Sequence, residues 1–185
     1  MRTYPSEKRT YADPITGVEV TQLTRYKCNS HHFYFTNPGW VKGGDWLLIS
    51  SDRENRTNLY GLDLNSGEIT QLTDLEPLEL PREVEFLRAC VSNTKDEVYY
   101  WHGYKLLALD LETMQQRELH EMPPNYDVSM VNCSADGKHV YASISEDMSD
   151  RFPVDLLRGY VGFRETHDAF PHSQVIKVAV DGSGG

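Results

Sequence analysis

Apolar and polar residues alternate along much of this chain, in short runs that end at turns rich in glycine and asparagine. One run is NLYGLDL at 58–64, which is followed by the turn 65–67 and by EITQLT at 68–73. Alternation with a period of two over four to eight residues is typical of β-strands, and helical spacing is nearly absent. The pattern therefore predicts an all-β protein.

The Gln-Leu-Thr ending of this run occurs twice, which indicates an internal repeat. Leu23 and Leu72 hold the same place in the two copies, 49 positions apart, and each follows a turn glycine. A third copy, LLALDLETMQQRELH, places Leu119 47 positions after Leu72, and VIKVAVDG begins a fourth. Four short antiparallel strands per unit, at a period of about 40 to 50 residues, are the pattern of a β-propeller blade. An ordinary β-sandwich with accidental similarity is the alternative.

The register of the repeat divides the chain into about three blades of one propeller domain, residues 1–185. We expect a lone outer strand at 18–24, blade one at 33–73, blade two at 87–122, and a partial blade three at 128–182 with an insertion at 146–172. Blade three has no outer strand, and propellers need about four to eight blades. We therefore expect an incomplete set, whose open sheet edge needs remaining blades or other chains to cover it.

Charge and composition narrow the expected partners. The chain has 18 basic and 28 acidic residues and a formal net charge of −10. Nucleic acid and anionic membrane surfaces are not expected as partners, because both need a basic footprint. No stretch reaches the roughly 20 apolar residues of a membrane span, and the N-terminus has no apolar signal-peptide core, so we expect a cytoplasmic protein. The three cysteines form no CxxC pair and are predicted to be small buried hydrophobic residues.

Three segments resemble the N-terminal portion of the oligogalacturonate lyase family. They are TGVEVTQLTRYKCNSHHFYFTNPGW, LLISSDRENRTNLYGLDLNSGEITQLTDL and SEDMSDRFPVDLLRGYVGFRETHDAFPHSQVIKVAVDG, and the similarity spans about residues 15–182. The second segment is shared with TolB-type propeller repeats generally. The His-His-Phe-Tyr-Phe run and the RGYVGFRE insertion are more particular to the family.

The resemblance implies a seven-bladed propeller of about twice this length that cleaves short uronate oligomers by β-elimination, as in pectin degradation. Family members use a divalent metal, commonly Mn²⁺, held by His and Gln side chains, together with a His base, and these residues belong to later blades. No position here matches them, so the resemblance assigns no metal ligand and no catalytic residue to this chain, and predicts that it has no lyase activity alone. The parent's partner would be an acidic oligosaccharide of the unsaturated digalacturonate type. The alternative is a non-catalytic, TolB-like propeller that acts as a binding or interaction scaffold.

Recognition of a uronate needs cations for its carboxylates and aromatic faces for its rings. In a propeller, the loops that enter the inner strands and the loops that join the second and third strands share one face. In this register, the face receives residues 29–32, 51–57, 81–88, 101–103 and 146–172. The candidate substrate-binding residues on it are His31, His32, Arg53, Arg164 and His172.

The candidates in blade one have structural alternatives. His31 and His32 precede the aromatic run FYF, and either bind substrate or cap the entry to a strand; alternation lets at most one of them face the channel. Arg53 either binds a carboxylate or pairs with the neighbouring Asp52 and Glu54.

The insertion carries Arg164 and His172 among apolar residues. Its stretch PVDLLRGYVGF predicts a short helix after Pro153 that packs apolar side chains against the face, namely those of Leu156, Leu157 and Tyr160. The adjacent residues Glu165, His167 and Asp168 suggest either a metal site or, because neighbouring loop positions supply poorly spaced ligands, a solvated charge cluster.

Overall fold

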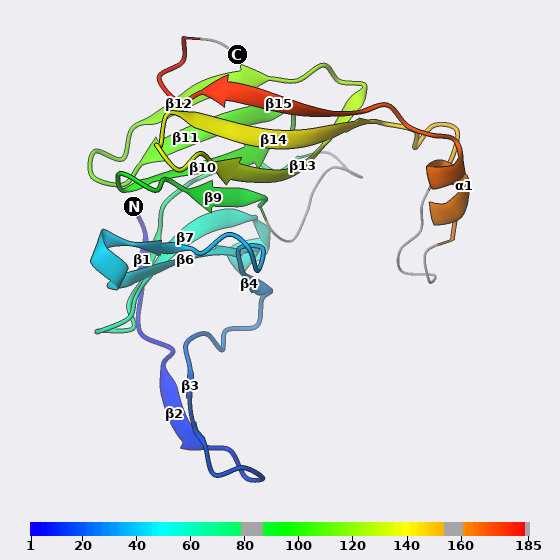
Figure 1. Ribbon diagram of the computed structural model, residues 1–185. Helices are drawn as coiled ribbons and strands as arrows, with labels where there is room; N and C mark the ends of the chain where they lie inside the picture. The colour runs from blue at the N-terminus through cyan, green and yellow to red at the C-terminus, as the bar shows by residue number, and fades with distance from the viewer. Residues whose placement is uncertain (79–86, 154–160, 184–185) are drawn as a thin grey trace.

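The computed structural model describes residues 1–78, 87–153 and 161–183. Three antiparallel sheets follow one another along the chain and lie side by side, and a two-stranded hairpin projects away from them (Figure 1). Within these ranges, no helix has the length and apolar character needed to cross a membrane. The all-β propeller architecture that the sequence predicted is confirmed.

Blade one contains six strands, with the order β1-β8-β7-β6-β4 and with β5 also paired to β6. Their bounds are β1 Thr3–Tyr4, β4 Ser30–His32, β5 Trp40–Val41, β6 Trp46–Ser51, β7 Asn58–Asp63 and β8 Ile69–Gln71. The short 3-10 turns are η1 Lys42–Gly44, before β6, and η2 Arg53–Asn55, between β6 and β7. The inner strand is therefore split into β4 and β5, both of which pair with β6.

Blade two has the order β12-β11-β10-β9, and blade three has the order β13-β14-β15. Their bounds are β9 Ala89–Val91, β10 Glu97–His102, β11 Lys105–Asp110, β12 Gln116–Glu121, β13 Tyr126–Cys133, β14 His139–Glu146 and β15 Ser173–Ala179. The helix α1, Phe163–Asp168, lies between β14 and β15 in the chain and apart from the sheets (Figure 1). The helix expected after Pro153 falls largely on residues 154–160, outside the described residues.

The strand expected to stand alone at 18–24 is instead half of a hairpin. Here β3, Glu19–Gln22, pairs antiparallel with β2, Arg9–Ala12. The turn forms because the Asp13 carboxylate accepts the backbone N–H groups of Ile15 and Thr16, while Gly17 adopts a φ of +72°. The preceding segment thus supplies a partner that the repeat register did not predict.

The core lies between the sheets, and blade two, the middle one of the three, is covered on both faces. In β10, Val98 and Tyr100 pack in the cluster shared with blade one, while Tyr99 and Trp101 pack in the cluster shared with blade three. All four side chains are buried. A strand covered on both faces becomes a continuous apolar run, which explains VYYW in place of alternation. Of the cysteines, Cys90 is buried, whereas the other two are only half-buried.

Candidate functional site

Loops from all three blades meet at one face of the molecule. The backbone N–H of Asn29 donates to the Asp52 carboxylate at 2.7 Å, which joins the entry to β4 with the turn after β6. Between blades, the N–H of Leu87 donates to the Ser50 hydroxyl at 2.8 Å. In blade three, the N–H of Asp147 donates to the carbonyl of Asn125 at 2.8 Å. The Leu87 contact therefore joins the end of β6 in blade one to the segment that leads into β9 in blade two.

A pocket of about 390 Å³ opens on this face between blades two and three. Aromatic side chains and one arginine form much of its wall, together with acidic and hydroxyl groups; they include Arg88, Trp101, Tyr104, Tyr126, Asp127 and Ser149. Arg88 immediately precedes β9, and Tyr126 and Asp127 begin β13, so the inner strands of two blades fix these groups. Aromatic faces beside a cation are the arrangement that binds an acidic sugar.

Arg88 is the half-buried cation of this pocket. Burial lowers the pKa of its guanidinium, and the nearby negative charge of Asp127 opposes that shift. Arginine nevertheless stays protonated in proteins, and its planar fork of donors matches a carboxylate in two-point geometry. The Trp101 indole N–H, also buried, donates to no acceptor among the described residues, which leaves an unsatisfied donor in the pocket wall.

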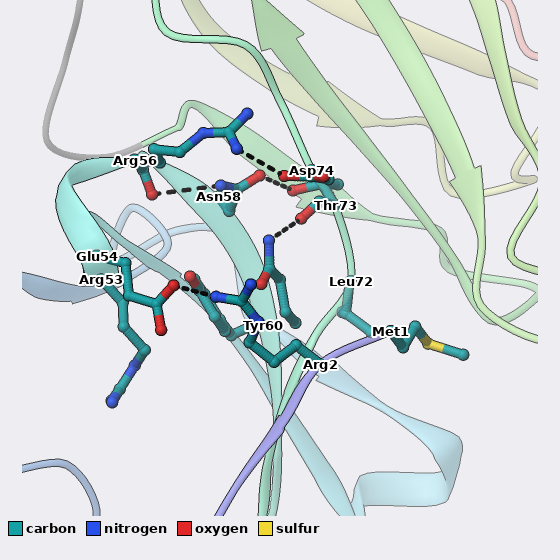
Figure 2. A pocket seen from close by; sticks show the side chains of 11 residues that line it. Met1, Arg2, Arg53, Glu54, Arg56, Asn58, Tyr60, Leu72, Thr73 and Asp74 are labelled. Atoms are coloured by element: carbon teal, nitrogen blue, oxygen red, sulfur yellow. Dashed lines mark hydrogen bonds and ion pairs between the residues drawn. The ribbon is translucent and has the colours of Figure 1, made fainter.

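A larger pocket, of about 580 Å³, is lined by residues of blade one and by the N-terminal residues Met1 and Arg2. Figure 2 shows that its charged side chains pair with one another: Arg2 contacts Glu54, and Arg56 contacts Asp74 at 3.2 Å. A ligand carboxylate would have to displace these acidic partners. The smaller pocket beside Arg88 is therefore the better candidate for binding an acidic ligand.

The predicted substrate ligand Arg53 is buried and contacts other side chains of the protein. Its side chain is only 3% exposed and forms an ion pair with Glu7 at 2.8 Å. The guanidinium also lies 4.8 Å from the ring centre of Tyr4 and 4.6 Å from that of Tyr26. The predicted pairing with Asp52 and Glu54 is not the one formed, because the N-terminal segment folds back and provides Glu7.

The two predicted histidines of blade one lie on β4. His31 is half-buried opposite Ser50, whereas His32 is exposed opposite Ile49 and lies next to the Phe33 ring. Their different exposure agrees with strand alternation, which sends neighbouring side chains to opposite faces.

The two predicted ligands of the insertion lie outside both pockets. The Arg164 side chain is 88% exposed on α1 and pairs with Asp168 at 3.2 Å. His172 is exposed, and its ring Nδ1 lies 3.2 Å from the Gln174 amide. Neither is brought to Arg88, which sequence reasoning did not single out. The available signal was its position, a lone arginine directly before the apolar inner strand ACV.

Within the described residues, no three His, Cys, Asp or Glu side chains gather as a group that could hold a metal ion. Glu165, His167 and Asp168 lie on α1 and are all exposed, as expected for a solvated charge cluster. The residues described here therefore do not fit a metal centre, and we assign no metal-dependent step to them.

Comparisons with known proteins agree on one family. A family model described as oligogalacturonate lyase matches residues 2–181. The oligogalacturonate lyase of Dickeya dadantii is 28% identical over 118 residues, covering 63% of this chain and 29% of that protein. The oligogalacturonide lyase of Pectobacterium atrosepticum is 28% identical over 123 residues, covering 66% and 30%.

Solved structures show the same fold. An oligogalacturonate lyase in complex with manganese superposes with a TM-score of 0.83 at 23% identity, covering all of this chain and 46% of that one. An oligogalacturonate lyase of Vibrio parahaemolyticus gives 0.80 at 20% identity, with 97% and 46% coverage. A putative TolB of Agrobacterium tumefaciens gives 0.58 at 14% identity, with 96% and 58% coverage. The chain spans less than half the length of the lyases it matches. Because the family model matches nearly all of it, the chain belongs to the oligogalacturonate lyase family.

Proposed function

We propose that this chain is the N-terminal part of a metal-dependent oligogalacturonate lyase, and that its role there is to bind an acidic oligosaccharide. The observation that carries the proposal is the half-buried Arg88 in a pocket walled by Tyr104, Tyr126 and Trp101. The guanidinium provides two parallel donors for a uronate carboxylate, and the aromatic side chains provide faces for the sugar rings.

Cleavage by β-elimination needs a base that removes the proton next to the carboxylate and a cation that stabilises the resulting enolate-like charge. A divalent metal such as Mn²⁺ supplies that cation when it is bound. We propose that the metal ligands and the base belong to residues outside 1–185. The contribution of this chain is then to bind and orient the substrate, and it has no lyase activity alone.

Isothermal titration calorimetry of the chain with digalacturonate tests this proposal, with and without Mn²⁺. Neutral digalactose is the matched control ligand, since it has similar rings and no carboxylates. We expect heat of binding for digalacturonate only. The same mixtures, followed by ultraviolet absorbance, should show no unsaturated uronate product.

Equal binding of the two sugars would contradict recognition of the carboxylate. Binding of neither sugar would favour the scaffold alternative. A rising absorbance would show that residues of this chain complete the reaction, and would contradict the division of roles proposed above.

A further inference from the structure

The Asn37 side chain links blade one to the inner strands of blades two and three. It lies between β4 and β5 and is only 3% exposed. Its amide nitrogen donates to the carbonyl of Ala89 in β9 at 3.1 Å and to the carbonyl of Val131 in β13 at 2.7 Å. A primary amide has two N–H donors, so this one uses both, one on each of the next two blades.

Both acceptor carbonyls lie on strand edges with which no strand of the described residues pairs. The Trp101 N–H donates to the Arg88 carbonyl, so alternation directs the Ala89 carbonyl to the edge of β9 that faces away from β10. In β13, the Ser134 N–H bonds to β14, and Val131, three residues earlier, therefore faces away from β14. A buried carbonyl on such an edge needs a donor, and a single side-chain amide provides it on both strands.

The sequence Asn37-Pro38-Gly39 holds this amide in place. The Asn37 N–H donates to the Tyr34 carbonyl at 2.6 Å and closes a turn. The following proline favours extended backbone at Asn37. Gly39 then returns the chain to β6, where an added Cβ would lie 2.7 Å from the Leu48 carbonyl oxygen. The interruption of the inner strand of blade one thus has a purpose, because it turns the Asn37 side chain toward the next two blades.

The two carbonyls that Asn37 holds adjoin the two walls of the pocket between blades two and three. Arg88, which precedes Ala89, lines one wall, and residues 126–128 at the start of β13 line the other. The register of β13 with β14 shifts between these wall residues and Val131, which is a β-bulge. Bulges re-aim the side chains of a strand. Asn37 fixes β13 directly after the bulge, and so fixes the point from which this wall begins.

We propose that Asn37 is the positioning residue of this pocket: by holding β9 and β13 together, it sets the separation between Arg88 and the wall at 126–128. The inference rests on the proposed function, since this separation decides how a uronate meets both the guanidinium and the aromatic side chains. Asn37 is not among the described residues that line the pocket, so it acts through Arg88. A group that is ordered before binding gives higher affinity than one that must be ordered by the ligand.

Asn37→Ala removes both donors, and Asn58→Ala is the matched control. Asn58 is also a buried asparagine, 1% exposed, but it bonds Thr73 and Leu75 and not the inner strands of blades two and three. Titration calorimetry with digalacturonate compares the variants at a temperature at which circular dichroism shows both to be folded. Asn37→Ala should raise the Kd roughly tenfold, because a displaced Arg88 loses its charged hydrogen bonds to the carboxylate. Asn58→Ala should bind like the wild type.

Asn37→Ser is the milder variant, since its hydroxyl keeps one donor near the two carbonyls. Its Kd should lie between those of the wild type and Asn37→Ala. A role in stability alone would not produce this order in affinity, because all three proteins are compared in the folded state.

The indole N–H resonance of Trp101 reports on the pocket without any sugar. The ring packs in the cluster that contains Cys90 of β9 and Val131 of β13, so a change in the separation of these strands alters its surroundings. The resonance is assigned by its loss in Trp101→Phe. In proton–nitrogen NMR spectra it should shift in Asn37→Ala and stay in place in Asn58→Ala.

Wild-type affinity in Asn37→Ala overturns the positioning role, as do equal losses of affinity in Asn37→Ala and Asn58→Ala. A wild type that binds no digalacturonate contradicts the proposed function, and the Trp101 resonance then tests Asn37 by itself. In that case a shift confined to Asn37→Ala supports the role of Asn37 in setting the pocket, and an unchanged resonance overturns it.

Discussion

Arg53 and Glu7 form an ion pair at 2.8 Å that ties the turn after β6 to the N-terminal segment. The two residues are 46 positions apart in the sequence. Glu7 also accepts the backbone N–H groups of Arg25 and Tyr26 at 2.6 and 2.9 Å, so one carboxylate holds two segments against blade one. The arginine expected to bind substrate instead fastens the N-terminus.

Replacing Arg53 by methionine should therefore lower stability. The change leaves Glu7 with a poorly compensated charge, and removing one partner of a buried pair costs about 3 to 5 kcal/mol. Urea unfolding followed by circular dichroism measures the loss. Arg164→Met is the control, because the Arg164 side chain is 88% exposed and its pair with Asp168 lies at the surface, where we expect less than about 1 kcal/mol. Similar small losses for both variants would show that the Arg53 pair is not structural.

The same carboxylate predicts a dependence of stability on pH. Burial raises the pKa of Glu7, but the N–H groups of Arg25 and Tyr26 and the Arg53 guanidinium together lower it below its usual value. A group with a lowered pKa in the folded state contributes stability above its unfolded pKa, near 4.5, and loses it as pH falls through the folded value. Unfolding free energy should fall below about pH 4.5, and the fall should be smaller in Glu7→Gln. Identical pH profiles would contradict this account.

The Asn58 side chain hydrogen-bonds the segment that leads from β8 toward blade two. Its side-chain oxygen accepts the Thr73 hydroxyl and the Leu75 N–H, both at 2.8 Å, and the residue is 1% exposed. Asn58→Ala leaves a buried donor without an acceptor, which costs about 1 to 3 kcal/mol. Thermal unfolding should show this loss, whereas the exposed Asn65→Ala should unfold within about 0.5 kcal/mol of the wild type.

Arg88 should determine the affinity for digalacturonate if the proposed function is right. Arg88→Ala should weaken binding roughly tenfold or more, because hydrogen bonds to charged groups contribute about 1.5 to 3 kcal/mol. Arg88→Lys keeps the charge but loses the two-point geometry, so we expect an intermediate affinity. Titration calorimetry measures both, with Arg56→Ala in the other pocket as the control. Equal affinities of wild type and Arg88→Ala, with folding verified by circular dichroism, would exclude this arginine as a ligand.

Local sequence patterns predicted the strands, because the formation of a strand or a turn depends mainly on residues that are neighbours in the sequence. The turn at 65–67 connects β7 to β8 in the structure, as the repeat predicted. The split inner strand of blade one was not predicted, since β4 and β5 become visible only through their shared partner β6. The pairing of β2 with β3 was not predicted either, because the repeat includes β3 and does not include the segment before it.

The sequence by itself determined the architecture: period-two alternation and a repeated turn-and-strand unit specify stacked antiparallel blades, because strand faces and turns are local properties. Only the tertiary structure decided which charged groups face a ligand. Arg53 and Arg88 each lie next to a strand in a loop of the same face, yet one is buried by Glu7 and the other lines a pocket. Their difference depends on partners distant in the chain, because burial and charge pairing are set by how the blades and the N-terminal segment pack.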